Sequence, residues 1–183
     1  VGMLLDHFGL KLFDVTDSPI SGGSLVAYFA KTLRTPTDAL EGMLAHEAAL
    51  GIDNSNPWRE FAIRCERHRL ALRALVEHTK ADGKRLIGYG ASARSSTLLN
   101  YCGIDHRHLE AVADQNALKH GRFTPGTDIP IVTPDRAFAY RPDSILLLAW
   151  NFREEILAQI RGDYGWHGEV IVPLPGDPVV IRV

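Results

Sequence analysis

Residues 88–93, GYGASA, combine two glycines with alanine and serine at a spacing that could bind a phosphate group. It follows the G-x-G-x-x-G/A pattern, with alanine in the third small position. The first glycine allows a tight turn, the second lets a phosphate approach the backbone, and the third small residue lets the helix pack close to the strand. Free N–H groups and the helix dipole then favour a negative charge at the start of the following helix. The run therefore predicts a nucleotide-binding turn.

Three side chains close to this turn could add to the same site. Arg94 lies in the first turn of the expected helix and could pair with the anion, while the Ser92 hydroxyl could face the phosphate or cap the helix. Asp114 follows the second glycine of the turn by 24 residues (114 − 90), close to the roughly 20 residues at which an acid meets a ribose hydroxyl in dinucleotide-binding proteins. This spacing favours nucleotide binding over a purely structural turn.

A hydrolase interpretation of the same residues is weaker. Residues 90–94, GASAR, nearly match the G-x-S-x-G nucleophile elbow, and Asp143 and His167 follow in the order that hydrolases use. The closing glycine of the elbow is missing, however. Ser92 is therefore better explained as a phosphate-facing or capping residue than as a nucleophile.

The residues that commonly bind metals do not form a recognisable set. His106 and His108 flank an arginine, and the pattern shows no third ligand beside them. Cys65 and Cys102 are the two cysteines, too few for a disulfide framework or a four-thiolate zinc site. We predict no metal site in this chain.

Apolar periodicity predicts alternating strands and helices. We expect strands near residues 10–15, 25–30, 86–87, 109–113, 129–132, 144–149, 169–173 and 179–183, and helices near 39–50, 56–79, 92–103 and 152–160 and from 134. This order predicts an α/β fold: a Rossmann-like, doubly wound, mostly parallel sheet with helices on both faces, preceded by an N-terminal antiparallel strand pair. Ligands of such sheets bind at the carboxyl ends of the strands.

Two helix starts carry specific predictions. Asn56 should cap the long helix, with Pro57 in its first turn, and the apolar stripe that begins at Trp58 and Phe61 should pack on the sheet along the whole helix. Asn151 should cap the helix that follows the apolar run LLLA. The turn at 88–93, Asp114 and Asn151 should then gather at one edge of the sheet.

The N-terminal residues 1–9 have the pattern of the last turns of an amphipathic helix that ends at a glycine. We expect residues 1–34 to hold this helix end and the strand pair, within the same domain as residues 35–183, and the chain to be part of a longer polypeptide.

Composition limits the classes of partner. The 183 residues carry a formal net charge of −2 and 45% hydrophobic residues, without the basic clusters that bind nucleic acid. No apolar run approaches the roughly 18 residues of a membrane span, so we expect a cytoplasmic protein with a small-molecule partner, neither nucleic acid nor membrane.

Four separated motifs, in order, resemble a known family. They are SGGSLVAYFA, GYGASARSSTLLNYCGI, ADQNALKHGRFTPGTDIPIVTPD and LLLAWNFREEIL. Together they resemble the C-terminal domain of S-adenosylmethionine-dependent sugar C-methyltransferases. The resemblance runs from about Leu10 to Val172 and implies further zinc-binding and S-adenosylmethionine-binding domains outside this chain, so that this chain binds neither cofactor itself.

The resemblance also implies which residues hold the substrate. These are Gly88, Tyr89, Gly90, Ala91, Ser92, Arg94, Asp114, Lys119 and Asn151, with no catalytic residue among them. The sequence departs from the family pattern at Ser21, where histidine is common, at Arg94, where lysine is usual, and at Ser95 and Ser96, which replace Gly-Asn.

The implied function is that of a substrate-binding domain for a nucleoside diphosphate-linked deoxysugar, inactive by itself but part of a methyltransferase. In the complete enzyme, the resemblance implies that a base removes the proton beside a sugar carbonyl and that the enolate attacks the donor methyl. The alternative is the cofactor-binding domain of an NAD(P)-dependent oxidoreductase, because G-x-G-x-x-A followed by an acid is equally typical of that class. A regulatory module that has lost its ligand is a third interpretation.

Overall fold

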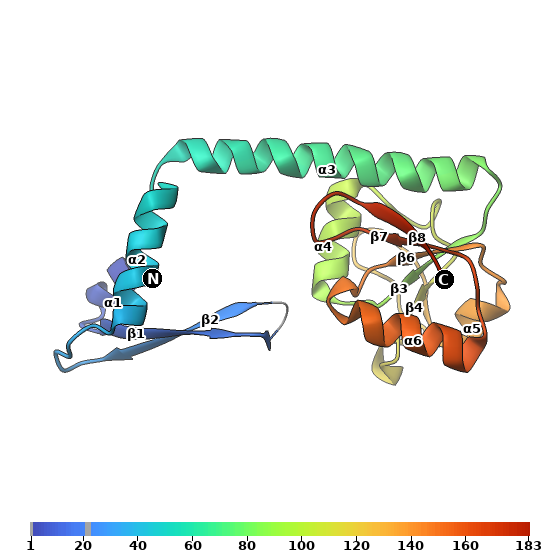
Figure 1. Ribbon diagram of the computed structural model, residues 1–183. Coiled ribbons are helices and arrows are strands. Elements are labelled where there is room, and N and C mark those ends of the chain that lie inside the picture. The colour runs from blue at the N-terminus through green and yellow to red at the C-terminus, as the bar shows by residue number, and fades with distance from the viewer. Residues whose placement is uncertain (1, 21–22) are drawn as a thin grey trace. The chain divides into compact units, whose positions relative to one another are not determined.

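The structure is a computed structural model that describes residues 2–20 and 23–183, and it divides into two compact units. Unit 1 comprises Val1–Ile63 and unit 2 comprises Arg64–Val183. The boundary falls inside the long helix α3, Ser55–Ala81 (Figure 1). The N-terminal strand pair that the sequence predicted lies in unit 1.

Unit 2 contains a six-stranded, mostly parallel sheet. Its strands are β3 (Leu86–Tyr89), β4 (Val112–Ala113), β5 (Ile131–Val132), β6 (Ser144–Leu147), β7 (Glu169–Val172) and β8 (Val179–Arg182). They lie in the order β5-β4-β3-β6-β7-β8, and only β8 pairs antiparallel to its neighbour. The chain builds the sheet outward from β3 in one direction and then returns to β6 on its other side. The carboxyl ends of β3 and β6 therefore lie next to each other where the order reverses.

Helices cover both faces of this sheet. The unit-2 helices are α4 (Ala93–Cys102), α5 (Pro134–Ala139) and α6 (Arg153–Tyr164), together with the C-terminal part of α3. One core cluster joins alternate strand residues to α3 and α4, and the other joins the remaining strand residues to α5 and α6. Each strand of the sheet centre is thus buried on both sides, which is typical of a parallel sheet covered by helices on both faces.

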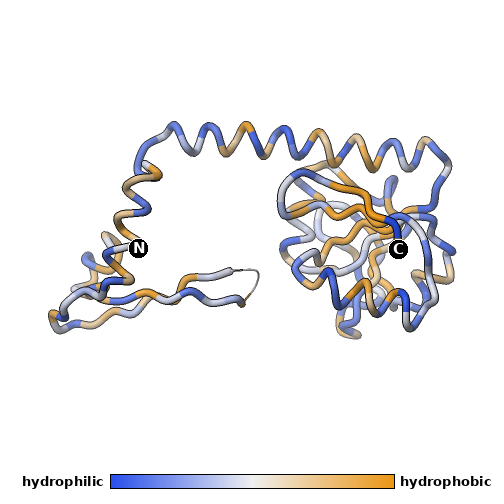
Figure 2. Tube along the Cα trace, in the orientation of Figure 1, coloured by the Kyte–Doolittle hydropathy of each residue, from blue (hydrophilic) through white to orange (hydrophobic). Residues whose placement is uncertain are grey.

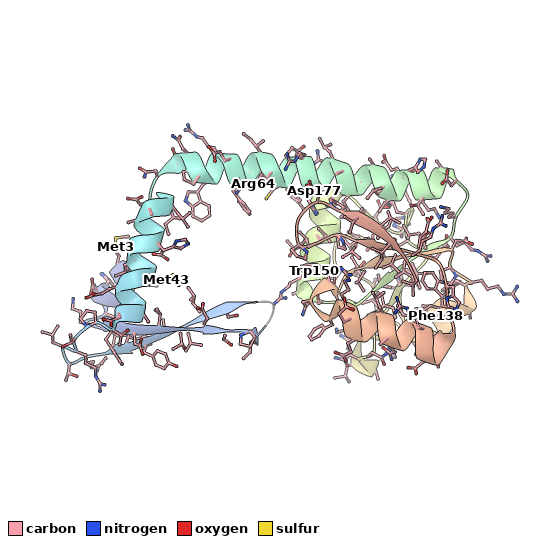
Figure 3. The ribbon with its side chains drawn as sticks, in the orientation of Figure 1. Met3, Met43, Arg64, Phe138, Trp150 and Asp177 are labelled. Atoms are coloured by element: carbon pink, nitrogen blue, oxygen red, sulfur yellow. The ribbon has the colours of Figure 1, made fainter. Side chains whose placement is uncertain are left out.

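The alternation is visible within β3. Leu86 belongs to the cluster under α3 and α4, whereas Ile87 belongs to the cluster under α5 and α6, and both are completely buried. Figure 2 shows the hydrophobic residues of unit 2 gathered in its central strands. Figure 3 marks Trp150 and Phe138, which are partly buried against the first and the second cluster respectively.

The predicted elements of unit 2 are present, with three strands shortened by two residues or more. The strand expected over 144–149 ends at Leu147. Strands were expected over 109–113 and 129–132, but only the last two residues of each pair with neighbours as β4 and β5. Two short 3₁₀ turns, η2 (Ala117–Lys119) and η3 (Trp150–Phe152), follow β4 and β6. Both turns lie on the carboxyl side of their strands, as expected of segments that surround a site.

Unit 1 has little interior of its own. It consists of α1 (Gly2–His7), β1 (Lys11–Ser18), β2 (Ser24–Ala30), α2 (Asp38–Leu50) and the first turns of α3. The two strands form the expected antiparallel pair, and α1 and α2 pack against β1. Among the described residues of unit 1, Val15 and Leu40 are the only buried apolar side chains.

The long helix differs from its prediction at its start. It begins at Ser55, so Asn56 lies inside the helix and not at its cap, although Pro57 does lie in the first turn. Leu72 and Val76 are buried against the sheet, but Trp58 and Phe61 are more than half exposed. At 1.5 Å per residue the helix is about 40 Å long, and the buried positions of α3 all lie in its C-terminal part, within unit 2. Within the described residues, no helix is long and apolar enough to cross a membrane.

Candidate functional site

The glycines of the predicted nucleotide-binding turn are required by packing. A Cβ atom at Gly88 would lie 2.8 Å from Leu148 Cδ1, and one at Gly90 would lie 2.4 Å from Ala149 Cβ. Gly90 also has φ +97°, a conformation that side chains rarely adopt. Both glycines therefore let β3 and its turn fit against neighbouring residues. The G-x-G pattern is explained without any phosphate.

The start of α4 is closed by a reciprocal serine cap. Ser92 Oγ accepts the N–H of Ser95 at 3.2 Å, and Ser95 Oγ accepts the N–H of Ser92 at 2.6 Å. Ser95 Oγ also lies 2.6 Å from the Ser92 carbonyl, to which it donates. This arrangement is a capping box in which serine takes the place that Glu or Gln usually holds. The predicted capping role of Ser92 is confirmed, whereas the contribution of Ser95 was missed because serine at this position is a weak signal.

Two backbone donors at the start of α4 remain available to an anion. Among described residues 2–20 and 23–183, no acceptor contacts the N–H group of Ala93 or of Arg94. The Arg94 side chain is exposed and forms no ion pair with a described residue. A cation in the first turn of a helix opposes the helix dipole, and no acidic residue lies in this turn to offset it. An anion bound here would satisfy both the N–H groups and the guanidinium.

Asp114 lies beside the turn, but its carboxylate is already occupied. Oδ2 accepts the N–H of Ala91 at 2.7 Å and the ammonium of Lys119 at 3.0 Å, while Oδ1 accepts the N–H of Asn116 at 2.8 Å. The residue is buried, with 8% of its surface exposed. The structure thus brings Asp114, Lys119 and the glycine turn together, as expected. It does not leave the carboxylate free for a ribose hydroxyl.

The loop after β4 forms one further contact with the turn and two within itself. Lys119 Nζ donates to the Ala91 carbonyl at 2.6 Å, and the His120 ring donates through Nε2 to the Asp114 carbonyl at 2.7 Å. Asn116 Oδ1 accepts the N–H of Leu118 and so caps η2. Neither Asn116 nor His120 was singled out from the sequence, because their contacts depend on how this loop folds back.

The Tyr89 side chain points away from the turn and into the sheet core. It is almost completely buried in the cluster under α5 and α6. Its hydroxyl donates to Gln159 Oε1 at 3.0 Å and accepts from Gln115 Nε2 at 3.3 Å. Burial raises the pKa of this phenol, so it stays neutral at physiological pH. A ligand at the turn would meet the Tyr89 backbone and not its ring.

Asn151 does not cap α6, contrary to the prediction. It lies within η3, and the N-cap residue of α6 is Phe152, whose side chain makes no capping hydrogen bond. The 3₁₀ turn delays the helix start, which is why the cap falls one residue later. Asn151 is exposed, and its segment reaches the glycine turn through Ala149, whose N–H donates to the Tyr89 carbonyl at 3.1 Å.

The residues of the hydrolase interpretation are not assembled. Ser92 follows the carboxyl end of β3, whereas Asp143 and His167 precede β6 and β7 and lie at the amino ends of the strands. Asp143 Oδ2 instead accepts the N–H of Arg85. The topology therefore does not support the hydrolase interpretation, in agreement with the missing glycine of the elbow.

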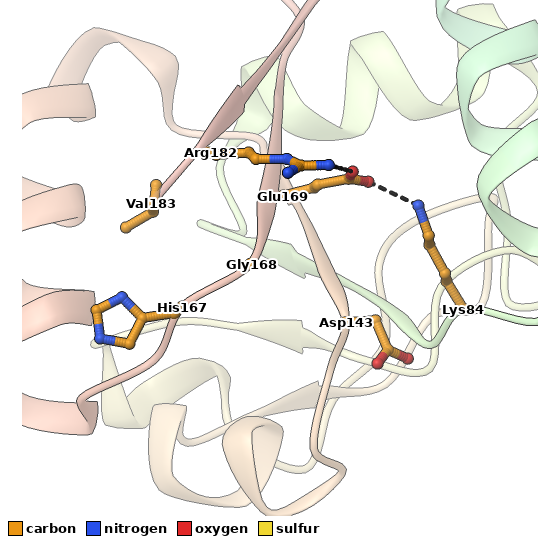
Figure 4. Close-up of a pocket in the computed structure, with 7 residues that line it drawn as sticks. All are labelled: Lys84, Asp143, His167, Gly168, Glu169, Arg182 and Val183. Atoms are coloured by element: carbon orange, nitrogen blue, oxygen red, sulfur yellow. Dashed lines mark hydrogen bonds and ion pairs between the residues drawn. The ribbon is translucent and has the colours of Figure 1, made fainter.

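A shallow depression of about 380 Å³ lies at that opposite edge of the sheet. Its lining residues are Lys84, Asp143, His167, Gly168, Glu169, Arg182 and Val183 (Figure 4). Glu169 pairs with Lys84 at 2.8 Å and with Arg182 at 3.7 Å, and its pKa is lowered chiefly by the hydrogen bond from Lys84. Lys84 and Arg182 are thus already paired with Glu169, and the depression lies away from the glycine turn.

The structure also places the residue types that commonly bind metals and most of the positions that depart from the family pattern. Within the described ranges, no group of three or more His, Cys, Asp or Glu side chains is placed to hold a metal ion. Ser21, the first departure from the family pattern, lies outside the described residues. The other departures are described: Ser95 forms the cap, and Ser96 Oγ donates to the Ser92 carbonyl at 3.2 Å.

Comparison with known proteins gives two results. Residues 19–175 match a family model described as the C-methyltransferase C-terminal domain. The chain is also 39% identical over 180 residues to C-methyltransferase NovU of Streptomyces niveus, an alignment that covers 97% of this chain and 43% of that protein. The chain therefore spans less than half the length of the curated relative that it matches.

Proposed function

Because the chain belongs to the family of C-methyltransferase C-terminal domains, we propose that it is the substrate-holding domain of an S-adenosylmethionine-dependent C-methyltransferase. The substrate class is a nucleoside diphosphate-linked deoxysugar. The strand order with its reversal between β3 and β6, and the helices on both faces, support a Rossmann-like, doubly wound arrangement for this domain.

The observation that carries the proposal is the unsatisfied positive end of α4. The N–H groups of Ala93 and Arg94 and the exposed Arg94 guanidinium lie together at the carboxyl end of β3. Backbone donors and a guanidinium at a helix start are a fitting partner for a diphosphate. Ligands of open α/β sheets bind where the strand order reverses, and this helix starts there.

The domain would contribute placement, not bond making. Fixing the diphosphate at α4 holds the sugar at a set distance from the anchor, so that binding energy is converted into orientation of the reacting carbon. We assign neither zinc nor S-adenosylmethionine to this chain: the described residues offer no cluster for a metal, and the turn of the G-x-G pattern is held by Asp114. By itself the chain would bind substrate without transferring a methyl group.

The exposed apolar side chains of unit 1 favour contact with a further domain of a longer methyltransferase. The large apolar side chains Met3, Leu4, Phe8, Leu25, Phe29 and Leu33 are all at least 49% exposed. The family match begins at residue 19, between β1 and β2, whereas the relative aligns with nearly the whole chain and is more than twice as long as the aligned part. We propose that the further part of such a methyltransferase, which would hold the cofactors, covers this surface.

Calorimetric titration tests the substrate class. The chain is titrated with thymidine, uridine and guanosine diphosphates and their glucose conjugates, and in parallel with NAD and S-adenosylmethionine. We expect binding of at least one nucleoside diphosphate. Arg94→Ala should weaken it by about 1–3 kcal/mol, the range for losing a hydrogen bond to a charged group.

Arg161→Ala is the matched control, because Arg161 is an exposed arginine in the last turn of α6. It should bind like the unchanged protein. Binding of NAD alone would replace the proposal with an oxidoreductase function, and equal affinity in Arg94→Ala would remove Arg94 from the site.

A further inference from the structure

The two groups of Ala91 that can form hydrogen bonds are both held by the loop that follows β4. Its N–H donates to Asp114 Oδ2 at 2.7 Å, and its carbonyl accepts from Lys119 Nζ at 2.6 Å. Lys119 and Asp114 also pair with each other at 3.0 Å. Each of the three residues therefore contacts the other two, although Ala91 lies 28 positions before Lys119 in the sequence. We call Asp114, Lys119 and Ala91 the turn clamp.

The clamp fixes two successive peptide units. The N–H of Ala91 belongs to the peptide that leaves Gly90, and its carbonyl belongs to the peptide that enters Ser92 at the cap of α4. Holding both groups restrains the φ and ψ angles of Ala91, and with them the direction in which α4 departs from β3. Gly90 immediately precedes Ala91 and has φ +97°. Because glycine can adopt many backbone dihedral angles, the turn could change its direction at Gly90 if the clamp were absent.

The carboxylate is well suited to this structural task. It accepts three hydrogen bonds from the protein, and its charge is compensated by Lys119 inside a site where Asp114 is only 8% exposed. A buried carboxylate that lost these partners would be strongly destabilised. Asp114 therefore cannot turn toward a ligand without giving up contacts that hold the turn.

These contacts determine which backbone N–H groups at the start of α4 are occupied and which are free to bind a ligand. Asp114 takes the N–H of Ala91, and the serine cap takes those of Ser92 and Ser95. Among the part of the chain that the structure describes, the N–H groups of Ala93 and Arg94 are the ones left without an acceptor in this turn. An incoming diphosphate would thus meet the N–H groups of Ala93 and Arg94.

We propose that Asp114 and Lys119 are positioning residues that lock the turn after β3, so that Ala93 and Arg94 present their donors in a fixed direction. This inference rests on the proposed function for its ligand, but the lock itself is a property of the unliganded chain. It assigns Asp114 a different task from the ribose-binding acid that its spacing after Gly90 suggested. Lys119 likewise acts through Ala91 and not on the phosphate.

The lock is tested first without ligand, by amide hydrogen exchange of the full chain observed by NMR. Asp114→Asn and Lys119→Met should speed the exchange of the Ala91 amide by roughly tenfold or more. The reason is that each variant lacks clamp contacts, so local opening of the turn costs less free energy. Lys80→Met is the control, because Lys80 forms a comparable ion pair with Glu110 at 3.0 Å on another part of unit 2. Unchanged exchange at Ala91 in both clamp variants would overturn the proposal.

The second measurement is the affinity for the nucleoside diphosphate that binds best to the unchanged protein. Lys119→Met should lower this affinity roughly tenfold, as expected when a binding group is misplaced, and Lys119→Arg should restore most of it because the ammonium contacts are replaced by guanidinium contacts. Lys80→Met should leave the affinity unchanged even if it lowers thermal stability. A tenfold loss of affinity without faster exchange at Ala91 would make Lys119 a direct ligand and would overturn its positioning role.

The two hypotheses fail in different ways. If no nucleoside diphosphate binds the unchanged protein, the proposed function fails, while exchange at Ala91 still decides whether the lock exists. If Asp114→Asn does not fold, Lys119→Met and Lys119→Arg carry the test, since the Lys119 side chain is 36% exposed.

Discussion

The two units of the chain bury very different shares of their apolar side chains. Unit 2 has two continuous clusters of buried residues, one on each face of its sheet. Unit 1 has comparable apolar residues in its strands, but Leu25 and Phe29 of β2 are each about half exposed. A two-stranded sheet with two helices packed against one of its strands has too few layers to enclose them. Apolar content alone does not make a core, because each apolar face needs a second layer to cover it.

Separating the units should give the largest effect. We expect residues 64–183 to fold cooperatively by themselves, because both core clusters lie within that range. Residues 1–63 should give the circular dichroism spectrum of a largely unfolded chain, since their buried apolar set is so small. A cooperative thermal transition in residues 1–63 would contradict the comparison.

Truncating one leucine in each unit sharpens the difference. Leu99→Ala removes a completely buried side chain of α4 and should lower the free energy of unfolding by about 2–5 kcal/mol. Leu25→Ala, at a half-exposed position of β2, should change it by less than about 0.5 kcal/mol. Urea unfolding of both variants measures this. Equal losses would mean that β2 is covered in solution by a part of this same chain.

Two glycines allow the same comparison for the backbone. Gly90→Ala places a methyl group 2.4 Å from Ala149 Cβ at φ +97° and should cost about 2–3 kcal/mol. Gly9→Ala, which follows α1 in unit 1, has φ +67° but nothing within 4 Å of the new methyl group, so it should cost about 1 kcal/mol. Thermal unfolding reports both values. A Gly90→Ala variant as stable as Gly9→Ala would show that β6 can move away from the turn.

Removing one acid of an ion pair in each unit should give the smallest difference in stability between the units. Arg107 forms hydrogen bonds to Asp105 in unit 2 and lowers the pKa of that carboxyl well below its usual range. A lowered pKa adds stability above the unfolded-state value near 4, and this stability is lost as pH falls toward the folded-state value. Asp105→Asn should therefore cost about 1 kcal/mol at pH 7, and the gap to the unchanged protein should narrow below about pH 4.

Asp6→Asn is the unit-1 counterpart of this variant. Asp6 pairs with Lys11, and both side chains are more than half exposed, so the change should stay below about 0.5 kcal/mol at every pH. Urea unfolding between pH 3 and pH 7 separates the two cases. A gap for Asp105→Asn that widened on acidification would have the wrong sign for a lowered pKa.

Most local elements could be predicted, because their causes are local. Ser92 caps the start of α4 as expected, and the helix ends near the predicted residue 103, where Gly103 has the left-handed conformation. The apolar run that begins at Ile145 indicates a strand, and β6 is buried on both faces over Ser144–Leu147. Asn151 failed as a cap because an intervening 3₁₀ turn depends on how residues 148–149 bond to the end of β3.

The candidate site shows the same division more sharply. The sequence by itself determined that a glycine turn, a helix start and an acid at the end of the next strand follow one another along the chain, because period, turn chemistry and spacing are local properties of the sequence. Only the tertiary structure decided that Asp114 faces Ala91 and Lys119 instead of open solvent. It also decided which half of α3 is buried and that unit 1 leaves its apolar faces exposed. The physical reason is that hydrogen-bond partners and burial are set by which segments pack together, and residues far apart in sequence, such as Ala91 and Lys119, acquire their roles only when the sheet brings their loops to one edge.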